Sequence, residues 1–209
     1  MPGSITLYFD IVSPFAWLAF YHLTRSLPAS ATLNLTPIFL GGLMQMTHNT
    51  PPIRILNKGA WTEKERKRLA KKYNIPIAEY APKNFPPNTL KAMRALAAVP
   101  EGKLRECVEA LYRRIWVEGN ADVQDEEVFG RILRGVLGDD EGKRVVERSK
   151  TEEIKELVKK NTQKAFDEGA FGLPYIVMED DKGKRDAVWG FDHVDLVWEF
   201  FGEELKGKL

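Results

Sequence analysis

Two proline-containing pairs, Ser13-Pro14 and Leu173-Pro174, are the residues of this sequence most suited to chemistry. Ser13-Pro14 stands where a strand-like run, residues 5–10, gives way to a helical pattern. Serine caps helix starts well, and proline is preformed for the first helical position. The first turn also carries unpaired N–H groups and a partial positive charge. A thiolate placed at this corner would therefore meet a hydroxyl and the helix end together.

The expected stabilisation is large enough to ionise a thiol near neutral pH. A free thiol has a pKa near ~8.5, and lowering that pKa by ~2 units requires roughly 2.7 kcal/mol. A helix end contributes up to ~2 kcal/mol, and a hydrogen bond to a charged group ~1.5–3 kcal/mol. No general base is needed. The alternative is that Ser13 is only a helix cap, but the Leu173-Pro174 segment favours a catalytic role.

The thiol has to come from another molecule. The corner reads Ser13-Pro14-Phe15-Ala16, and Cys107 is the only cysteine of the chain. A single cysteine excludes an internal disulfide and a cysteine-rich metal site. Cys107 has the helical spacing typical of a core residue. The three histidines show no metal-ligand spacing, so we expect no metal.

The composition is that of an ordinary globular protein. The chain has 209 residues, of which 44% are apolar and 29% charged, enough for a substantial core. The net charge of +1 gives no reason to expect nucleic acid or a membrane surface as a partner. No apolar run reaches the ~18 residues of a membrane span. A strand-like pattern that starts by Ser4 leaves no room for a targeting presequence.

The hydrophobic patterns predict two strand-containing ends around a helical middle. The predicted elements are a strand at 5–10, a helix at 14–27, an extended stretch at 33–40 ended by Gly41-Gly42, helices at 62–73, 89–99, 104–119, 125–137 and 153–168, strands at 175–178 and 187–189, and a helix at 194–201. Ser149 is expected to cap the helix at 153–168, and Asp192 the helix at 194–201.

This order resembles the thioredoxin-like α/β fold. A large all-helical domain, residues 45–169, is inserted between the β-α-β half and the β-β-α half. The two halves, residues 1–44 and 170–209, would form one glutathione-binding domain. Redox members of this architecture carry two cysteines at the corner where this chain has Ser13, so dithiol chemistry is not expected here.

Several segments, in chain order, resemble kappa-class glutathione transferases. They are residues 9–18 (FDIVSPFAWL), 41–44 (GGLM), 49–52 (NTPP), 57–59 (NKG), 88–94 (NTLKAMR), 169–174 (GAFGLP) and 190–193 (GFDH). The resemblance runs from residue 4 to residue 201, and the related 2-hydroxychromene-2-carboxylate isomerases share much of it. It implies glutathione as the co-substrate and a homodimer.

The resemblance also implies roles for the corner. Ser13 would donate a hydrogen bond to the glutathione sulfur, with Pro14 and Phe15 completing the glutathione-binding corner. Leu173 would pair its main chain with the cysteinyl unit, and Pro174 would be cis. Phe15 stands where the family usually has tyrosine, so a hydroxyl is missing at that position.

Four further residues would complete the glutathione site. Asn49 and Lys58 would meet the glutathione backbone or a carboxylate, although Asn49 is also suited to starting a turn and Lys58 to a solvated surface. Phe191 would belong to the same site, and Asp192 would hold the γ-glutamyl end while capping its helix. A small hydrophobic electrophile would lie against an apolar wall of Phe15, Trp17, Met44, Met46 and Trp61.

The sequence therefore predicts an enzyme, a kappa-class glutathione transferase whose glutathione thiolate attacks a small electrophile or reduces a peroxide. Two alternatives stay open. One is glutathione-dependent isomerisation of the 2-hydroxychromene-2-carboxylate type, and the other is a non-catalytic module that binds peptides along the Leu173 edge. The chain ends Gly207-Lys208-Leu209, which resembles the Ser-Lys-Leu peroxisomal tripeptide. We expect a peroxisomal address, with mitochondrion and cytoplasm as alternatives.

Overall fold

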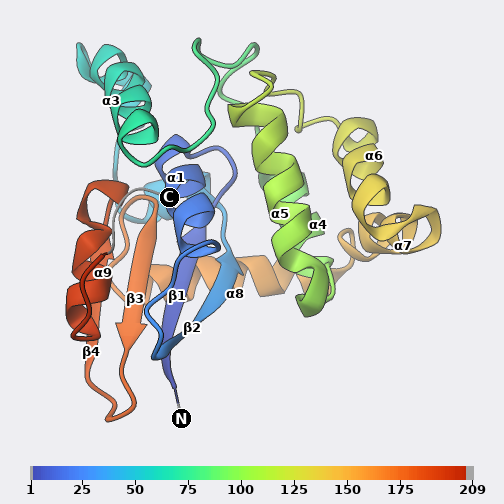
Figure 1. The fold of residues 1–209 in the computed structure, drawn as a ribbon. Coiled ribbons are helices and arrows are strands. Elements are labelled where there is room, and N and C mark those ends of the chain that lie inside the picture. Colours follow the sequence, from blue (N-terminus) through green and yellow to red (C-terminus); the bar gives the residue numbers. More distant parts are fainter. Residues whose placement is uncertain (1, 206–209) are drawn as a thin grey trace.

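A four-stranded mixed sheet forms the centre of the computed structural model, which describes residues 2–205. The strands are β1 (Gly3–Phe9), β2 (Ala31–Pro37), β3 (Tyr175–Glu179) and β4 (Arg185–Trp189), in the order β2-β1-β3-β4 (Figure 1). β1 is parallel to β2 and antiparallel to β3, and β3 is antiparallel to β4. This confirms the predicted β-α-β and β-β-α halves in one thioredoxin-like sheet.

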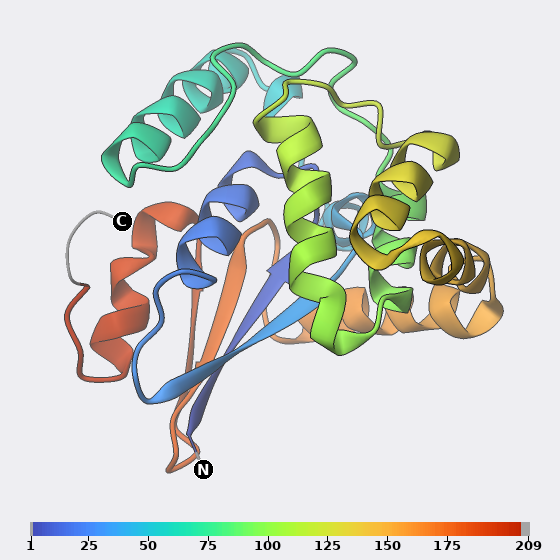
Figure 2. The same cartoon turned by 45° about the vertical axis from the view of Figure 1, so that its right-hand side comes forward.

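Nine α-helices and two short 3₁₀ turns complete the described part of the chain. They are α1 (Pro14–Leu23), α2 (Leu40–Met46), η1 (Pro52–Arg54), α3 (Lys58–Lys72), α4 (Leu90–Ala98), α5 (Glu101–Trp116), α6 (Glu126–Leu137), α7 (Asp139–Arg148), α8 (Glu152–Asp167), η2 (Phe191–His193) and α9 (Asp195–Phe200). α1 and α9 cover one face of the sheet and α8 crosses the other, while α4 to α7 form a separate helical group (Figures 1 and 2). No described helix is long and apolar enough to cross a membrane.

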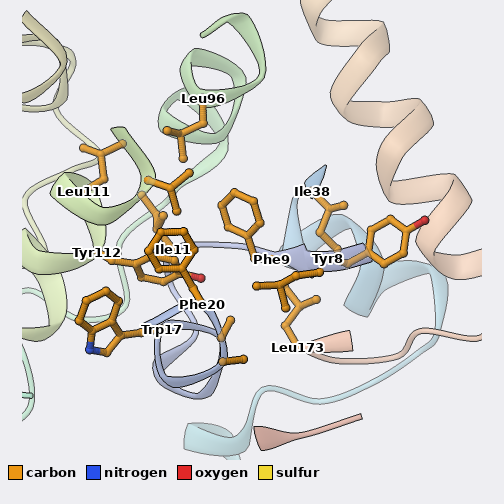
Figure 3. Close-up of a cluster of buried hydrophobic side chains, with 14 of the residues drawn as sticks. Tyr8, Phe9, Ile11, Trp17, Phe20, Ile38, Leu96, Leu111, Tyr112 and Leu173 are labelled. Atoms are coloured by element: carbon orange, nitrogen blue, oxygen red, sulfur yellow. The ribbon is translucent and has the colours of Figure 1, made fainter. Parts of the chain in front are cut away.

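The core connects the first helix with the inserted helices. The ring of Tyr112 on α5 lies 5.4 Å from that of Trp17 and 5.5 Å from that of Phe20, both on α1 (Figure 3). Trp17 is fully buried, and its indole N–H donates to the carbonyl of Pro76 at 2.9 Å. The prediction that Trp17 lines a substrate wall is therefore wrong. Cys107 is buried, as its spacing predicted.

The glycine pair 41–42 does not end an extended stretch as predicted. β2 ends at Pro37, and both glycines lie inside α2. Two features make a helix possible there. The buried Asp10 carboxylate accepts the N–H of Leu40, the first residue of α2, at 2.9 Å. A Cβ on Gly41 would lie 2.7 Å from the Phe39 ring, so a larger residue here would displace that ring.

The helix caps near α7 and α8 also differ from the prediction. Thr151, not Ser149, caps α8, with its hydroxyl accepting the N–H of Ile154. Ser149 follows the ten-residue helix α7, which the sequence pattern missed, and donates to the carbonyl of Val146. α7 buries only Gly142 and Val145, so it has too few apolar positions to show a helical period.

Gly207-Lys208-Leu209 lies outside the described residues, and its role as an address stays a prediction.

Candidate active site

Ser13 lies at the corner between β1 and α1 and contacts the Leu173 loop. Its backbone is extended, and its hydroxyl oxygen accepts the N–H of Ala16 at 3.2 Å, which makes it the N-cap of α1. The same hydroxyl donates to the carbonyl oxygen of Leu173 at 3.2 Å. Two segments 160 residues apart are thus brought together by the sheet, and the hydroxyl between them is buried. The N-cap role is confirmed, and the predicted contact of Ser13 with a ligand stays a prediction.

The Leu173 loop presents main-chain groups to the corner. The Leu173–Pro174 peptide bond is cis, as predicted. Gly190 donates its N–H to the Pro174 carbonyl at 3.1 Å and so fixes the loop to the end of β4. A Cβ on Gly172 would come within 2.8 Å of the Trp189 indole nitrogen, so this close approach requires glycine. Within residues 2–205 the N–H of Leu173 has no hydrogen-bond acceptor, which leaves it available to a ligand.

Asn49 ties the loop after α2 to the Leu173 loop. Its side-chain amide donates to the carbonyl of Phe171 at 2.7 Å, and its side-chain oxygen accepts the N–H of Thr50. The structure therefore brings Asn49 next to the corner. Lys58 is the first residue of α3 and is exposed, and its side chain makes no ion pair among the described residues. Phe15 is half-buried on the first turn of α1.

Asn49→Ala should weaken glutathione binding up to about tenfold, because a hydrogen bond worth about 0.5–1.5 kcal/mol that orders the Leu173 loop is lost. Isothermal titration calorimetry measures the change. Asn34→Ala is the matched control, since Asn34 is exposed on the edge strand β2. Equal affinities for the two variants would remove Asn49 from the site.

The turn that carries Phe191 and Asp192 differs from the predicted helix start. Phe191 is fully buried, with its ring 4.9 Å from that of Tyr73, so a direct contact with a ligand would require this turn to rearrange. Asp192 is exposed and does not cap α9. The residue at the N-cap is Val194, because the chain first makes the 3₁₀ turn η2. The predicted stabilising cap at Asp192 is therefore wrong, while its proposed contact with glutathione remains a prediction.

Asp10 is a site-supporting residue that sequence reasoning passed over. Its carboxylate is fully buried and accepts the N–H of Val12 at 3.1 Å, the N–H of Leu40 at 2.9 Å and the hydroxyl of Thr89. Its carbonyl accepts the N–H of Ser13 at 3.0 Å. Burial raises the pKa of Asp10 to about 6. Asp10 thus joins the Ser13 corner to the first turns of α2 and α4. Its place at the end of β1, next to the corner, was the available signal.

His22 cannot assist Ser13 as a base. It lies on α1 itself, fully buried, and its ring is 5.3 Å from those of Tyr73 and Trp198. Neither ring nitrogen has a hydrogen-bond partner within the described chain. Burial lowers the pKa of His22 to about 4, so the ring is neutral near pH 7. Among the described residues no group of three or more His, Cys, Asp or Glu side chains is arranged to hold a metal.

Comparisons with known proteins agree with this geometry. The DSBA-like thioredoxin domain family matches residues 4–201. The chain is 28% identical over 219 residues to glutathione S-transferase kappa 1 of Homo sapiens and 29% identical over 218 residues to that of Rattus norvegicus, each alignment covering 100% of this chain and 95% of the relative. The structure of 2-hydroxychromene-2-carboxylate isomerase is similar with a TM-score of 0.79, at 21% identity, covering 95% of this chain and 94% of that one.

Proposed function

The chain belongs to the DSBA-like thioredoxin domain family, and from this premise we propose that it is a glutathione transferase of the kappa type. The observation that carries the proposal is the buried Ser13 hydroxyl at the start of α1, in contact with the Leu173 carbonyl. Relatives matched along their whole length bear the name glutathione S-transferase kappa. The chain has no thiol at the corner, so the reactive sulfur belongs to the co-substrate glutathione.

The main chain of Leu173 suits the peptide part of glutathione. Its N–H is available and its C=O lies beside Ser13, so both can pair with the cysteinyl unit as one strand residue pairs with another. This pairing directs the cysteinyl sulfur towards the Ser13 corner. Asn49 orders the same loop from the other side. Lys58 and Asp192, both exposed, remain our candidates for the charged ends of glutathione.

Binding and thiol activation are coupled through the Ser13 hydroxyl. Without ligand, Ser13 donates its proton to the Leu173 carbonyl. When that carbonyl accepts the cysteinyl N–H instead, Ser13 is free to donate to the sulfur. The proton of the thiol leaves to solvent, and the hydroxyl and the α1 N-terminus stabilise the thiolate by about 1.5–3 and up to about 2 kcal/mol. The thiolate then forms a bond to carbon of the electrophile, and either a leaving group departs with its bonding electron pair or a π bond opens and its electron pair takes up a proton from solvent.

The second substrate is a small hydrophobic electrophile bound beside the corner. The half-buried Phe15, Met44 and Met46 and the 55% exposed Trp61 support this part of the proposal, because they leave apolar surface near α1 and α2. We also retain the homodimer as a proposal. The exposed apolar side chains of Ile53 and Leu56, before α3, would supply surface for a second copy of the chain to bury.

Ultraviolet difference titration with glutathione tests the proposal. We expect the thiolate band of bound glutathione to persist below pH 7, because the corner should lower the pKa of the thiol by about 2 units from its usual value. S-methylglutathione, which has no thiol, is the control and should bind without the band. Binding of glutathione with no thiolate would identify a passive binding module, and absence of binding would contradict the proposal.

A model electrophile then separates the two enzymatic outcomes. A transferase should release a stable glutathione conjugate, which mass spectrometry detects at the expected mass. A glutathione-dependent isomerase would form the thiolate and yet accumulate no conjugate, because its adduct with the substrate is reversible.

A further inference from the structure

A second polar cavity lies in the helical part of the molecule and shares no residue with the Ser13 corner. It has a volume of about 320 Å³ and is lined by residues of α4, the start of α6, the turn between α7 and α8, and the first turn of α8. Its lining residues are Lys91, Arg94, Glu126, Ser149, Lys150 and Lys155. Four of these six side chains are cationic and one is anionic, in a chain whose net charge is only +1.

Two of the four cations are neutralised by neighbouring carboxylates. Lys150 lies 2.8 Å from a carboxylate oxygen of Glu126 and 2.8 Å from one of Glu147. Lys155 lies 2.6 Å from a carboxylate oxygen of Glu152. These ion pairs compensate the charges of Lys150 and Lys155.

Lys91 is exposed and Arg94 is half-buried, and neither is within ion-pair distance of a carboxylate among residues 2–205, although the charge of Arg94 lowers the pKa of Glu152 from longer range. Among residues 2–205 neither side chain makes a hydrogen bond or an ion pair, and the Nε of Arg94 is shielded from solvent without an acceptor. A buried polar group left unpaired costs about 1–3 kcal/mol, so such groups in folded proteins call for an explanation. Lys91 and Arg94 are spaced i,i+3 on α4, which puts them on the same face of the helix.

We propose that this cavity binds the phosphate group of a small phosphate monoester. The two unpaired charges match the charge of about −1.5 to −2 that such a group carries near pH 7. The planar guanidinium of Arg94 lines the cavity, and its two terminal nitrogens can donate parallel hydrogen bonds to phosphate oxygens. The volume lies at the lower end of ligand pockets, which suits a small molecule. Glu126 also lines the cavity, where its carboxylate is paired with Lys150.

Phosphate titrations of the full-length protein test the proposal, with binding of inorganic phosphate measured by calorimetry at constant ionic strength. Arg94→Gln should weaken phosphate binding about tenfold or more, and Lys91→Gln several-fold. Arg105→Gln is the matched control, because Arg105 is exposed on α5 and does not line the cavity. It should bind phosphate like the unsubstituted protein. Equal losses in Arg94→Gln and Arg105→Gln, or no phosphate binding by the unsubstituted protein, would overturn the proposal.

Two further arms identify the ligand and keep the proposal independent of the glutathione site. Glycerol phosphate should bind at least as tightly as inorganic phosphate if the cavity binds phosphate monoesters. A preference for inorganic phosphate would identify the free ion as the ligand and would contradict a monoester site. Acetate should bind far more weakly than either. Circular dichroism verifies the fold of each variant. Glutathione binding should be unchanged in Arg94→Gln, and its loss together with phosphate binding would contradict a separate site.

Discussion

Replacing Ser13 with alanine should raise the pKa of bound glutathione by about 1–2 units, because the thiolate loses a hydrogen bond worth about 1.5–3 kcal/mol. Near neutral pH, kcat/KM should fall about ten- to a hundredfold, since each 1.36 kcal/mol corresponds to about a factor of ten. Folding should change little. The lost cap on Ala16 costs only about 1 kcal/mol. Thiolate titration and steady-state kinetics measure the two effects.

Two variants separate the catalytic role of Ser13 from its structural one. Thr151→Ala removes the comparable cap of α8, far from the corner in sequence, and should cost similar stability with no change in the glutathione pKa. Ser13→Thr keeps the hydroxyl and should restore part of the activity. If glutathione titrates identically in Ser13→Ala and in the unsubstituted protein, Ser13 is only a cap and the proposed mechanism fails.

Local turn chemistry explains why the centre of the site was predictable from sequence. A Ser-Pro pair at a strand end specifies a helix cap, and a Gly-Leu-Pro run before a second strand specifies a loop that must lie against the same sheet. The sheet order then leaves one arrangement, in which Ser13 contacts Leu173. Asn49 was proposed from the family resemblance, since its sequence neighbours by themselves indicated only a turn.

Residues whose role depends on distant partners were not predictable. Arg66 lies in a run of charged residues that reads as a solvated helix face, yet it is fully buried. Its guanidinium donates to the Glu63 carboxylate at 2.7 and 2.9 Å and to the Ala78 carbonyl at 2.7 Å. Asp10 reads as a strand end, and only the fold shows that Leu40 and Thr89 converge on it. Such polar burial is set by tertiary contacts, which no local pattern records.

Asp10 and His22 should make opposite contributions to stability between pH 4 and pH 7. The pKa of Asp10 is raised to about 6 in the folded protein, compared with about 4 in the unfolded chain. Its contribution to the free energy of unfolding is therefore fully present below pH 4 and is lost as the pH rises through 6. The pKa of His22 is lowered to about 4 in the folded protein, compared with about 6.5 in the unfolded chain. Its contribution to the free energy of unfolding is therefore fully present above pH 6.5 and is lost as the pH falls through 4. Each change amounts to roughly 3 kcal/mol, so the two nearly cancel.

Substituting either residue should reveal the pH dependence of stability that the other one contributes. In Asp10→Asn the free energy of unfolding should fall, relative to the unsubstituted protein, by roughly 3 kcal/mol from pH 7 to pH 4, because only the His22 contribution remains. In His22→Phe it should rise by a similar amount over the same range, because only Asp10 remains. Urea unfolding at several pH values measures both slopes. Differences between pH values are compared, so the fixed packing cost of each substitution does not enter.

The same variant of Asp10 links this pH dependence to the active site. Ionised Asp10 is a negative charge three residues from Ser13, and like charges disfavour a thiolate. Asp10→Asn should therefore lower the pKa of bound glutathione while weakening glutathione binding, since the amide cannot accept both the Val12 and Leu40 N–H groups. A purely structural role would weaken binding without lowering that pKa. Parallel stability curves for Asp10→Asn and the unsubstituted protein would mean that the Asp10 carboxyl has the same pKa in the folded and unfolded chain, and would contradict the raised pKa. An unchanged pKa of bound glutathione in Asp10→Asn would contradict the electrostatic link to the active site.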